Sequence, residues 1–158
     1  MSLSPKPARF SQAEQINIVM SGHINGAGRL FGGILVEWID VVAAVAARRH
    51  SGCDVTTAAI DNLQFKSPAY AGDTVILNAR LTYAGRTSME VRVDTYVESL
   101  QGARRLINTA YLVMVALDAK GNPAPVPPLQ IETEEQKLEY EAAALRKELR
   151  KKRRAQGY

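Results

Sequence analysis

Residues 24–50, INGAGRLFGGILVEWIDVVAAVAARRH, join a glycine-rich loop to a long apolar segment that decides the fold. From about residue 31 to residue 50, the length of this segment and its wealth of alanine predict a helix. One narrow stripe of the helix holds Glu37, Asp40, Ala44 and Arg48, and the rest of its surface holds Ile34, Leu35, Val36, Trp38, Ile39, Val41, Val42 and Val45. A helix that is apolar on nearly all sides is buried, so we expect it at the centre of the fold.

The composition is that of one ordinary globular domain. The 158 residues are 46% hydrophobic and 23% charged, and no apolar run reaches the length of about 18 residues that a membrane span needs. The opening residues, MSLSPKPARF, lack the apolar stretch of a secretory signal. One cysteine, Cys53, excludes an intrachain disulfide framework and, with only two histidines, a cysteine-based metal site. We therefore expect a cytoplasmic protein without a metal.

The net charge of +4 arises near the end of the chain. Residues 146–154 hold seven Lys or Arg and one Glu, whereas residues 1–145 hold thirteen basic and fifteen acidic residues. Such a run is most often a solvated helix end and only sometimes a contact with nucleic acid. Thr133 followed by Gln136 is typical of a capping box at a helix start. We expect a folded domain over residues 1–128 and a basic C-terminal helix or tail over residues 129–158.

The remaining patterns predict strands. Five segments are strand-like: residues 14–20, 55–65, 75–83, 88–98 and 105–117. The third and fourth alternate with period two across a short link, which predicts an antiparallel hairpin with Glu90, Arg92 and Asp94 directed away from the core. The fifth is apolar on both faces, as in a central or interface strand.

With one helix before residue 130, a parallel α/β sheet is not available. We expect an α+β fold in which an antiparallel five-stranded sheet wraps around one long central helix, with a C-terminal helix added. The last four strands are expected to form a meander. The sheet would have open edges, which favours a dimer.

The glycines before the helix are the first candidate for chemistry. A dinucleotide fingerprint needs glycine where Phe31 stands, and a phosphate-binding P-loop needs lysine where Ile34 stands, so both motifs fail. Gly32 and Gly33 nevertheless lie at a helix N-terminus, whose free N–H groups bind anions or a developing oxyanion. The alternative is that these glycines serve only a tight turn.

Asp40 and Asn25 are the other candidates. Because burial of an unpaired carboxylate is costly, Asp40 should be paired with Arg48 or another base, face solvent beside Glu37, or serve a cleft. Asn25 either caps the loop backbone or uses its amide on a carbonyl or a water. His23 and His50 lack partners at metal-ligand spacing and are expected to be structural or surface residues. Covalent catalysis by Ser or Cys is not expected, because Cys53 has no nucleophile signature and no G-x-S-x-G elbow occurs.

Several motifs occur in a fixed order along the chain. They are the N-x-x-G loop at residues 25–28, Phe31-Gly32-Gly33, Asp40, Arg49-His50, the F-x-x-P-x-x-x-G-D segment at residues 65–73, and G-R-T-S-M at residues 85–89. Together they resemble the hot-dog-fold acyl-CoA thioesterases of the YciA and brain acyl-CoA hydrolase type, over roughly residues 14–118. The resemblance does not cover the terminal basic helix.

The resemblance implies hydrolysis of acyl-CoA thioesters to free acid and coenzyme A, an activity of lipid metabolism. It implies Asn25 and Asp40 as the catalytic pair and the Gly33 N–H as the oxyanion donor. Asp40 would act as general base on water or as nucleophile, and Asn25 would position the water or the carbonyl. Residues that would bind the coenzyme A moiety are Gly32, Arg86, Thr87 and Ser88. Coenzyme A is then part of the substrate, and no separate cofactor is expected.

Helix geometry predicts that one chain does not complete the site. Gly33 and Asp40 are seven residues apart, which is about 10 Å along a helix. A general base must lie within about 3 Å of its proton or act through one water. If two such helices pack antiparallel in a dimer, Gly33 of one approaches Asp40 of the other. This agrees with the family's two composite sites per dimer, and a tetramer or hexamer is expected beyond it.

Two other functions remain open at this point. One is a non-catalytic acyl-CoA-binding regulator of the same fold, whose basic tail contacts nucleic acid; no helix-turn-helix pattern supports it. The other is a related dehydratase, which usually relies on an Asp and His pair, and the apolar helix carries no His near Asp40.

Overall fold

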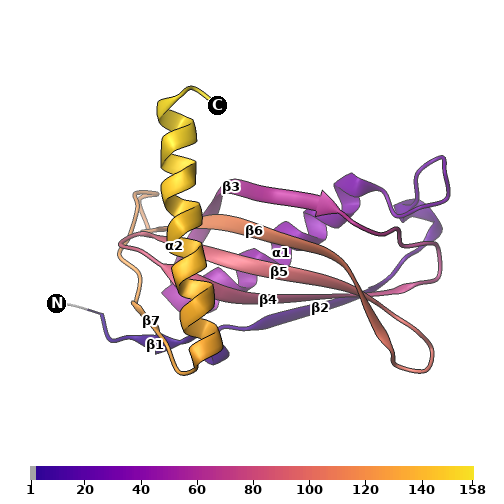
Figure 1. Ribbon diagram of the computed structural model, residues 1–158, viewed down its shortest axis with the longest axis horizontal. Coiled ribbons are helices and arrows are strands. Elements are labelled where there is room, and N and C mark those ends of the chain that lie inside the picture. Colours follow the sequence, from indigo (N-terminus) through magenta and orange to yellow (C-terminus); the bar gives the residue numbers. More distant parts are fainter. Residues whose placement is uncertain (1–2) are drawn as a thin grey trace.

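The computed structural model describes residues 3–158 and places helix α1 (Gly32–Ser51) against one face of an antiparallel sheet (Figure 1). The strands of the sheet are β2 (Ala13–Ile18), β3 (Asp54–Phe65), β4 (Thr74–Ala84), β5 (Ser88–Glu98) and β6 (Arg104–Leu117). Helix α2 (Glu134–Ala155) crosses the other face. Short strands β1 (Lys6–Pro7) and β7 (Leu129–Gln130) pair in parallel beside the sheet, and 3₁₀ turns span Ala8–Phe10 and Ser21–His23. The predicted α+β class, with five strands around one long helix, is confirmed.

The strand order is β2-β4-β5-β6-β3, so one part of the predicted topology is wrong. Only β4, β5 and β6 form a meander, and β3 pairs with β6 instead of β4. The reason lies in the link between β3 and β4, residues 66–73, which is bound to the loop before α1. The Leu30 N–H donates to the Ala69 carbonyl at 2.8 Å, and Arg29 forms a bridge with Tyr70. The link therefore crosses the end of the sheet, and β3 becomes an edge strand.

The core lies between α1 and the inner face of the sheet. Helix α1 contributes Leu35, Trp38, Ile39, Val42, Ala43, Ala46 and Ala47, and the sheet contributes Val75, Leu77, Leu81, Val91, Val93, Leu112 and Met114, among others. Each large side chain buried in this way stabilises the fold by about 1.5–3 kcal/mol. Gly52 ends the helix with φ of 69°, and its N–H donates to the Arg48 carbonyl at 2.8 Å. Val41 and Val45 remain 50% and 36% exposed, so a single chain does not bury α1 on all sides as predicted.

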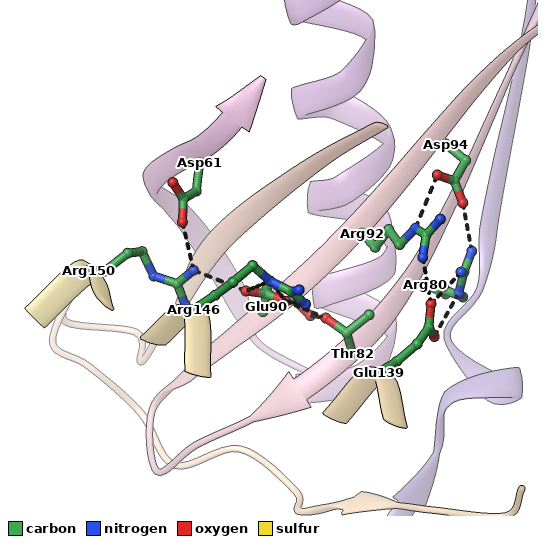
Figure 2. A network of polar contacts seen from close by, with 9 residues as sticks. All are labelled: Asp61, Arg80, Thr82, Glu90, Arg92, Asp94, Glu139, Arg146 and Arg150. Atoms are coloured by element: carbon green, nitrogen blue, oxygen red, sulfur yellow. Dashed lines mark hydrogen bonds and ion pairs between the residues drawn. The ribbon is translucent and has the colours of Figure 1, made fainter. Parts of the chain in front are cut away.

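The outer face of the sheet carries charged side chains that α2 covers. Glu90 and Asp94 point away from the core as predicted, yet they are only 1% and 3% exposed. Figure 2 shows Asp94 accepting hydrogen bonds from Arg80 and Arg92 at 3.0 and 3.1 Å. Glu139 of α2 binds the same two arginines at 2.6 and 2.9 Å. The two carboxylates balance the two guanidinium groups, and this joins the first half of α2 to the sheet.

The second half of α2 binds the sheet through arginines of the basic run. Arg146 and Arg150 donate to Glu90 at 2.7 and 3.0 Å (Figure 2). Arg150 and Arg153 also donate to Asp61 of β3 at 3.1 and 3.0 Å. Burial raises the pKa of Asp61, but the hydrogen bonds and charges of Arg153 and Arg150 outweigh burial and lower it. The sequence pattern did not indicate that these bases face carboxylates of the sheet.

The predicted start of α2 is confirmed. The Thr133 hydroxyl accepts from the Gln136 N–H at 3.2 Å, and the Gln136 side chain accepts from the Glu132 N–H at 2.8 Å. Within residues 3–158, no helix has both the length and the apolar character that a membrane crossing requires.

Candidate active site

The loop before α1 holds Asn25 by its amide oxygen. Asn25 Oδ1 accepts from the N–H groups of Ala27 and Arg29 at 3.0 and 3.2 Å. Because both partners are N–H donors, the atom that faces them is the oxygen, and the Nδ2 amide is left to donate elsewhere. Gly28 completes the loop with φ of 74°, a conformation that favours glycine. Asn25 is therefore a loop-capping residue with an exposed amide donor.

The N-terminus of α1 presents free donors. The Phe31 carbonyl accepts from the N–H groups of Ile34 and Leu35 at 3.0 and 3.2 Å. Within residues 3–158, the N–H groups of Gly32 and Gly33 have no acceptor. A β carbon on Gly33 would lie 2.6 Å from the Phe31 ring, so glycine permits this close approach. Two N–H groups at the positive end of the helix dipole suit a negatively charged oxygen.

A hollow of about 350 Å³ lies at this helix end. Asn25 and Gly32 both line it, whereas Gly33 is not among its lining residues. The rest of the wall is formed by Arg29, Leu30, Leu35, Phe65, Lys66, Ser67, Pro68, Ala69 and Ile107. The structure thus brings the predicted loop and helix residues together at a partly apolar hollow.

Asp40 lies farther along α1 and contacts β3. Its Oδ1 accepts a hydrogen bond from the Thr57 hydroxyl at 2.6 Å. The alternative pairing of Asp40 with Arg48 is wrong, because Arg48 pairs with Asp54 at 3.2 Å. Within residues 3–158, Asp40 Oδ2 has no hydrogen-bond donor, so this oxygen is available to a ligand. Sequence reasoning missed Thr57, which lies on the exposed edge strand that follows the helix.

Three of the four predicted coenzyme A residues, Arg86, Thr87 and Ser88, lie at the opposite end of the sheet, whereas Gly32 lines the first hollow. The hairpin that holds Arg86, Thr87 and Ser88 follows β4, whose eleven residues span about 36 Å from the end of the sheet nearest Asn25. Thr87 and Ser88 line a second hollow, of about 530 Å³. Arg86 is exposed beside it and is not a lining residue.

This second hollow has a basic wall. Helix α2 contributes Lys147, Arg150, Arg153 and Arg154, and the sheet contributes Asp61 and Glu90. Four positive charges thus stand against two negative ones, which leaves an excess of two positive charges. Residues 58–61 of β3 also line the hollow, close in sequence to Thr57.

The two histidines have structural contacts. His50 is buried, and its Nε2 lies 2.9 Å from the Pro127 carbonyl oxygen. His23 stacks edge-on against Trp38 with ring centres 5.1 Å apart, and its Nδ1 accepts from the Met20 N–H at 3.0 Å. Neither histidine forms a hydrogen bond with Asp40 within residues 3–158, so the geometry does not match an Asp and His dehydratase pair.

Comparison with known proteins finds relatives of one kind. The sequence model of the Thioesterase superfamily matches residues 27–102. The uncharacterized acyl-CoA thioester hydrolase YkhA of Bacillus subtilis is 40% identical over 131 residues, which cover 82% of this chain and 76% of that protein. The cytosolic acyl coenzyme A thioester hydrolase of Rattus norvegicus is 31% identical, and the match covers 88% of this chain but only 38% of that longer protein.

Solved structures agree with these relatives. A hexameric acyl-CoA thioesterase crystallised in its apo form is 42% identical, with a TM-score of 0.92, 97% of this chain covered and 99% of that one. An acyl-CoA hydrolase from Staphylococcus aureus, in complex with butyryl coenzyme A and coenzyme A, is 35% identical with a TM-score of 0.90, over 96% of this chain and 93% of that one. Structures of three variants of the Staphylococcus aureus enzyme also match, in which an asparagine, an aspartate or a threonine is replaced by alanine. Those three positions are 15 and 17 residues apart, as are Asn25, Asp40 and Thr57 here.

Proposed function

This chain belongs to the hot-dog-fold acyl-CoA thioesterases of the YciA and cytosolic acyl-CoA hydrolase type, and we propose that it hydrolyses its thioester substrate at sites that two copies of the chain build together. The observation that carries the proposal is the Asp40–Thr57 hydrogen bond beside the unpaired edge of β3. This bond holds the Asp40 carboxylate beside the β3 edge, where a second copy of the chain would supply the rest of the site.

Asp40 acts as the general base. Thr57 donates to Oδ1 and orients the carboxylate, and Oδ2 takes a proton from water. The water oxygen attacks the thioester carbonyl carbon, the carbon–sulfur bond breaks, and the coenzyme A sulfur receives the proton from Asp40. The spacing of Asn25, Asp40 and Thr57, which equals that of the substituted positions in the Staphylococcus aureus enzyme, supports these assignments.

The N-terminus of α1 stabilises the oxyanion. The free N–H groups of Gly33 and Gly32 point out of the helix start, where negative charge on the carbonyl oxygen develops. Asn25, whose Nδ2 is free, donates to the carbonyl or to the attacking water. Loss of one such donor typically reduces kcat by about 100-fold to 1,000-fold.

The edge strand explains how two copies complete the site. In one chain, Gly32 lies against Phe65 at the end of β3, whereas Asp40 is bound to Thr57 near its start. Eight residues of strand separate Thr57 from Phe65, which is about 26 Å. If two β3 strands pair antiparallel about a two-fold axis, the Phe65 end of one copy lies beside the Thr57 end of the other. Asp40 of one copy then approaches the helix N-terminus of the other.

The exposed side of α1 supports the same pairing. Val41 follows Asp40 on the helix, Val45 lies one turn after Val41, and the two are 50% and 36% exposed. A second α1 packed across this side would bury both valines, with a gain of about 25 cal/mol for each Å² of apolar surface removed from water. It would also exclude water from the surroundings of Asp40.

The second hollow suits the phosphate groups of coenzyme A. Thr87 and Ser88 offer hydroxyl groups, and the wall has an excess of two positive charges. The hollow reaches residues 58–61 of β3, which follow Thr57 on the same strand. We assign the nucleotide end of the substrate to this hollow and to Arg86 beside it.

The decisive experiment measures thiol release from a panel of acyl-CoA substrates of different chain lengths. We expect Asp40→Asn to reduce kcat by about 100-fold to 10,000-fold, because it removes the base without a change in shape. Glu14 of β2, which is exposed at the edge of the sheet opposite β3, supplies the control, and Glu14→Gln should keep the wild-type rate. Asp40→Ala and Asn25→Ala should both lose most activity while the oligomer persists. Full turnover by Asp40→Ala would show that the base is elsewhere.

A single turnover in ¹⁸O-labelled water tests for attack by Asp40 as a nucleophile. With Asp40 as base, the label enters the product acid and Asp40 stays unlabelled. Label in the peptide that contains Asp40 would instead reveal attack by the carboxylate on the thioester.

A further inference from the structure

The basic wall of the second hollow contains arginines that are held to very different degrees. Arg150 donates to Glu90 and Asp61 at 3.0 and 3.1 Å, and its side chain is only 14% exposed. Figure 2 shows Arg150 between these two carboxylates. Among the described residues, 3–158, Arg153 pairs only with Asp61, at 3.0 Å, and its side chain is 46% exposed. Arg150 is therefore fixed to the sheet, whereas Arg153 is held by one accessible contact.

Asp61 would keep a partner if Arg153 left it. Its Oδ1 accepts from Arg153 and its Oδ2 from Arg150. A buried carboxylate that loses its sole partner is strongly destabilising. Here Arg150 stays bound to the other oxygen, so the departure of Arg153 does not leave Asp61 unpaired. Arg153 also lies two residues before the end of α2 at Ala155, where a helix opens most easily.

Two other cations of the wall, Lys147 and Arg154, have no carboxylate partner within residues 3–158. Lys147 Nζ lies 3.4 Å from the Tyr83 hydroxyl and 4.8 Å from the centre of the Tyr83 ring, and Arg154 is exposed. Lys147 and Arg154 are seven residues apart, so they lie on one side of the helix, about 10 Å from each other along its axis. Arg153 is next to Arg154. Long side chains from these three positions can reach one bound group.

We propose that these three cations bind the 3′-phosphate of coenzyme A, and that Arg153 transfers from Asp61 to that phosphate when the substrate binds. This inference rests on the function proposed above. A phosphate monoester has three terminal oxygens and a charge of about −1.5 to −2. It therefore matches the three available cations and the excess of two positive charges in the wall. Each phosphorus of the diphosphate bridge has only two such oxygens.

The exchange explains why a hollow that suits an anion contains Asp61. Coenzyme A is a product as well as part of the substrate, and without Asp61 it would bind more tightly. Asp61 competes for Arg153 and takes it back as coenzyme A leaves, which favours release of the product. Glu90 does not compete in this way, because its side chain is 1% exposed and is bound by both Arg146 and Arg150.

The first experiment measures the dissociation constant of coenzyme A by titration calorimetry on the full chain. Arg153→Gln should raise it about 10-fold, because it removes a charge-assisted hydrogen bond. The same variant should leave the dissociation constant of 3′-dephospho-coenzyme A nearly unchanged. Arg104 is 42% exposed beside Glu98 at the other end of β5, so Arg104→Gln is the matched control and should change neither value. Equal weakening of both ligands by Arg153→Gln, or no weakening of coenzyme A, would overturn the proposal.

The second experiment is a double-variant cycle that tests the exchange itself. Asp61→Asn should lower the dissociation constant of coenzyme A about 10-fold, because Arg153 no longer has to leave a carboxylate. In an Arg153→Gln background the same change should have a much smaller effect, since no guanidinium group is released. An equal gain in both backgrounds would show that Asp61 acts only as a negative charge and would contradict the exchange. The first experiment does not use the Asp61 variant, so it decides the proposal if Asp61→Asn fails to fold.

Turnover separates this inference from the proposed function. Arg153→Gln should raise KM for an acyl-CoA and keep kcat, because a contact far from the thioester contributes equally to substrate and transition-state binding. Wild-type thiol release with unchanged coenzyme A affinity in the variants would refute the phosphate exchange alone. Absence of thiol release from every acyl-CoA by the wild-type chain would refute the proposed function, whatever the binding data.

Discussion

Two inactive variants should restore each other if the active site is shared between chains. Asn25→Ala removes the amide donor from the loop side of the site, and Asp40→Ala removes the base from the helix side. In a hybrid dimer, one site combines both defects. The other site combines Asn25 of one chain with Asp40 of its partner and is intact.

The size of the recovery follows from the two-fold symmetry. Random reassociation of equal amounts makes half of the dimers hybrids, and half of the sites in each hybrid are intact, so about one quarter of the wild-type activity should return. The assay is thiol release from an acyl-CoA after the two variants have been mixed, reversibly dissociated and reassociated. Hybrid dimers purified through two different tags should reach about one half of the wild-type activity.

A second mixture provides the control. Asp40 and Thr57 belong to the same half of the site, since they are hydrogen-bonded within one chain at 2.6 Å. A mixture of Asp40→Ala and Thr57→Val should therefore have no more activity than the average of the two variants measured separately. If the mixture of Asn25→Ala and Asp40→Ala also stays at the average of its parents, each chain has a complete site, and the argument from the edge strand is wrong.

Three further predictions follow from individual contacts. Thr57→Val should lower kcat by about 10-fold to 100-fold with little change in KM, because a hydrogen bond to a charged group contributes about 1.5–3 kcal/mol; an unchanged kcat would exclude an orienting role. Burial lowers the pKa of His50 more than its bond to the Pro127 carbonyl raises it, so the unfolded chain binds a proton that the folded chain does not. The free energy of unfolding should thus fall as the pH falls through about 6.5, and His50→Gln should flatten this dependence in urea titrations. Glu90→Gln leaves two arginines of α2 facing a neutral side chain and should lower the free energy of unfolding by about 3 kcal/mol. Glu98→Gln removes a charge from a more exposed pair with Arg104 and should lower it by less than about 1 kcal/mol. Equal shifts in the urea midpoint of the two variants would contradict this difference.

The sequence predicted the elements of this fold well because their patterns are local. The apolar helix shows its period over twenty residues, and the hairpin from β4 to β5 shows its own over two strands and a short link. The place of β3 is different, because it depends on contacts such as the hydrogen bond between the Leu30 and Ala69 backbones, 39 residues apart. A periodic sequence pattern does not indicate which strand an edge strand pairs with.

The site was predictable in part for a similar reason. Asn25 and Asp40 drew attention because a polar residue in a glycine loop or in an apolar helix needs an explanation. Thr57 did not, since a threonine on a strand is ordinary there. The arginines of α2 were interpreted as solvated because the pattern gives no distance between Arg146 and Glu90, which pair at 2.7 Å across 56 residues.

The separation of Asn25 from Asp40 also has a consequence for how activity depends on the amount of protein. A chain released from the ribosome would carry half of a catalyst and would leave acyl-CoA untouched until it met another copy. At low concentration, the rate would then rise with the square of the protein concentration, and it would become linear once dimers are saturated. The dissociation constant of the pair would thereby set a threshold below which the thioester pool is not consumed.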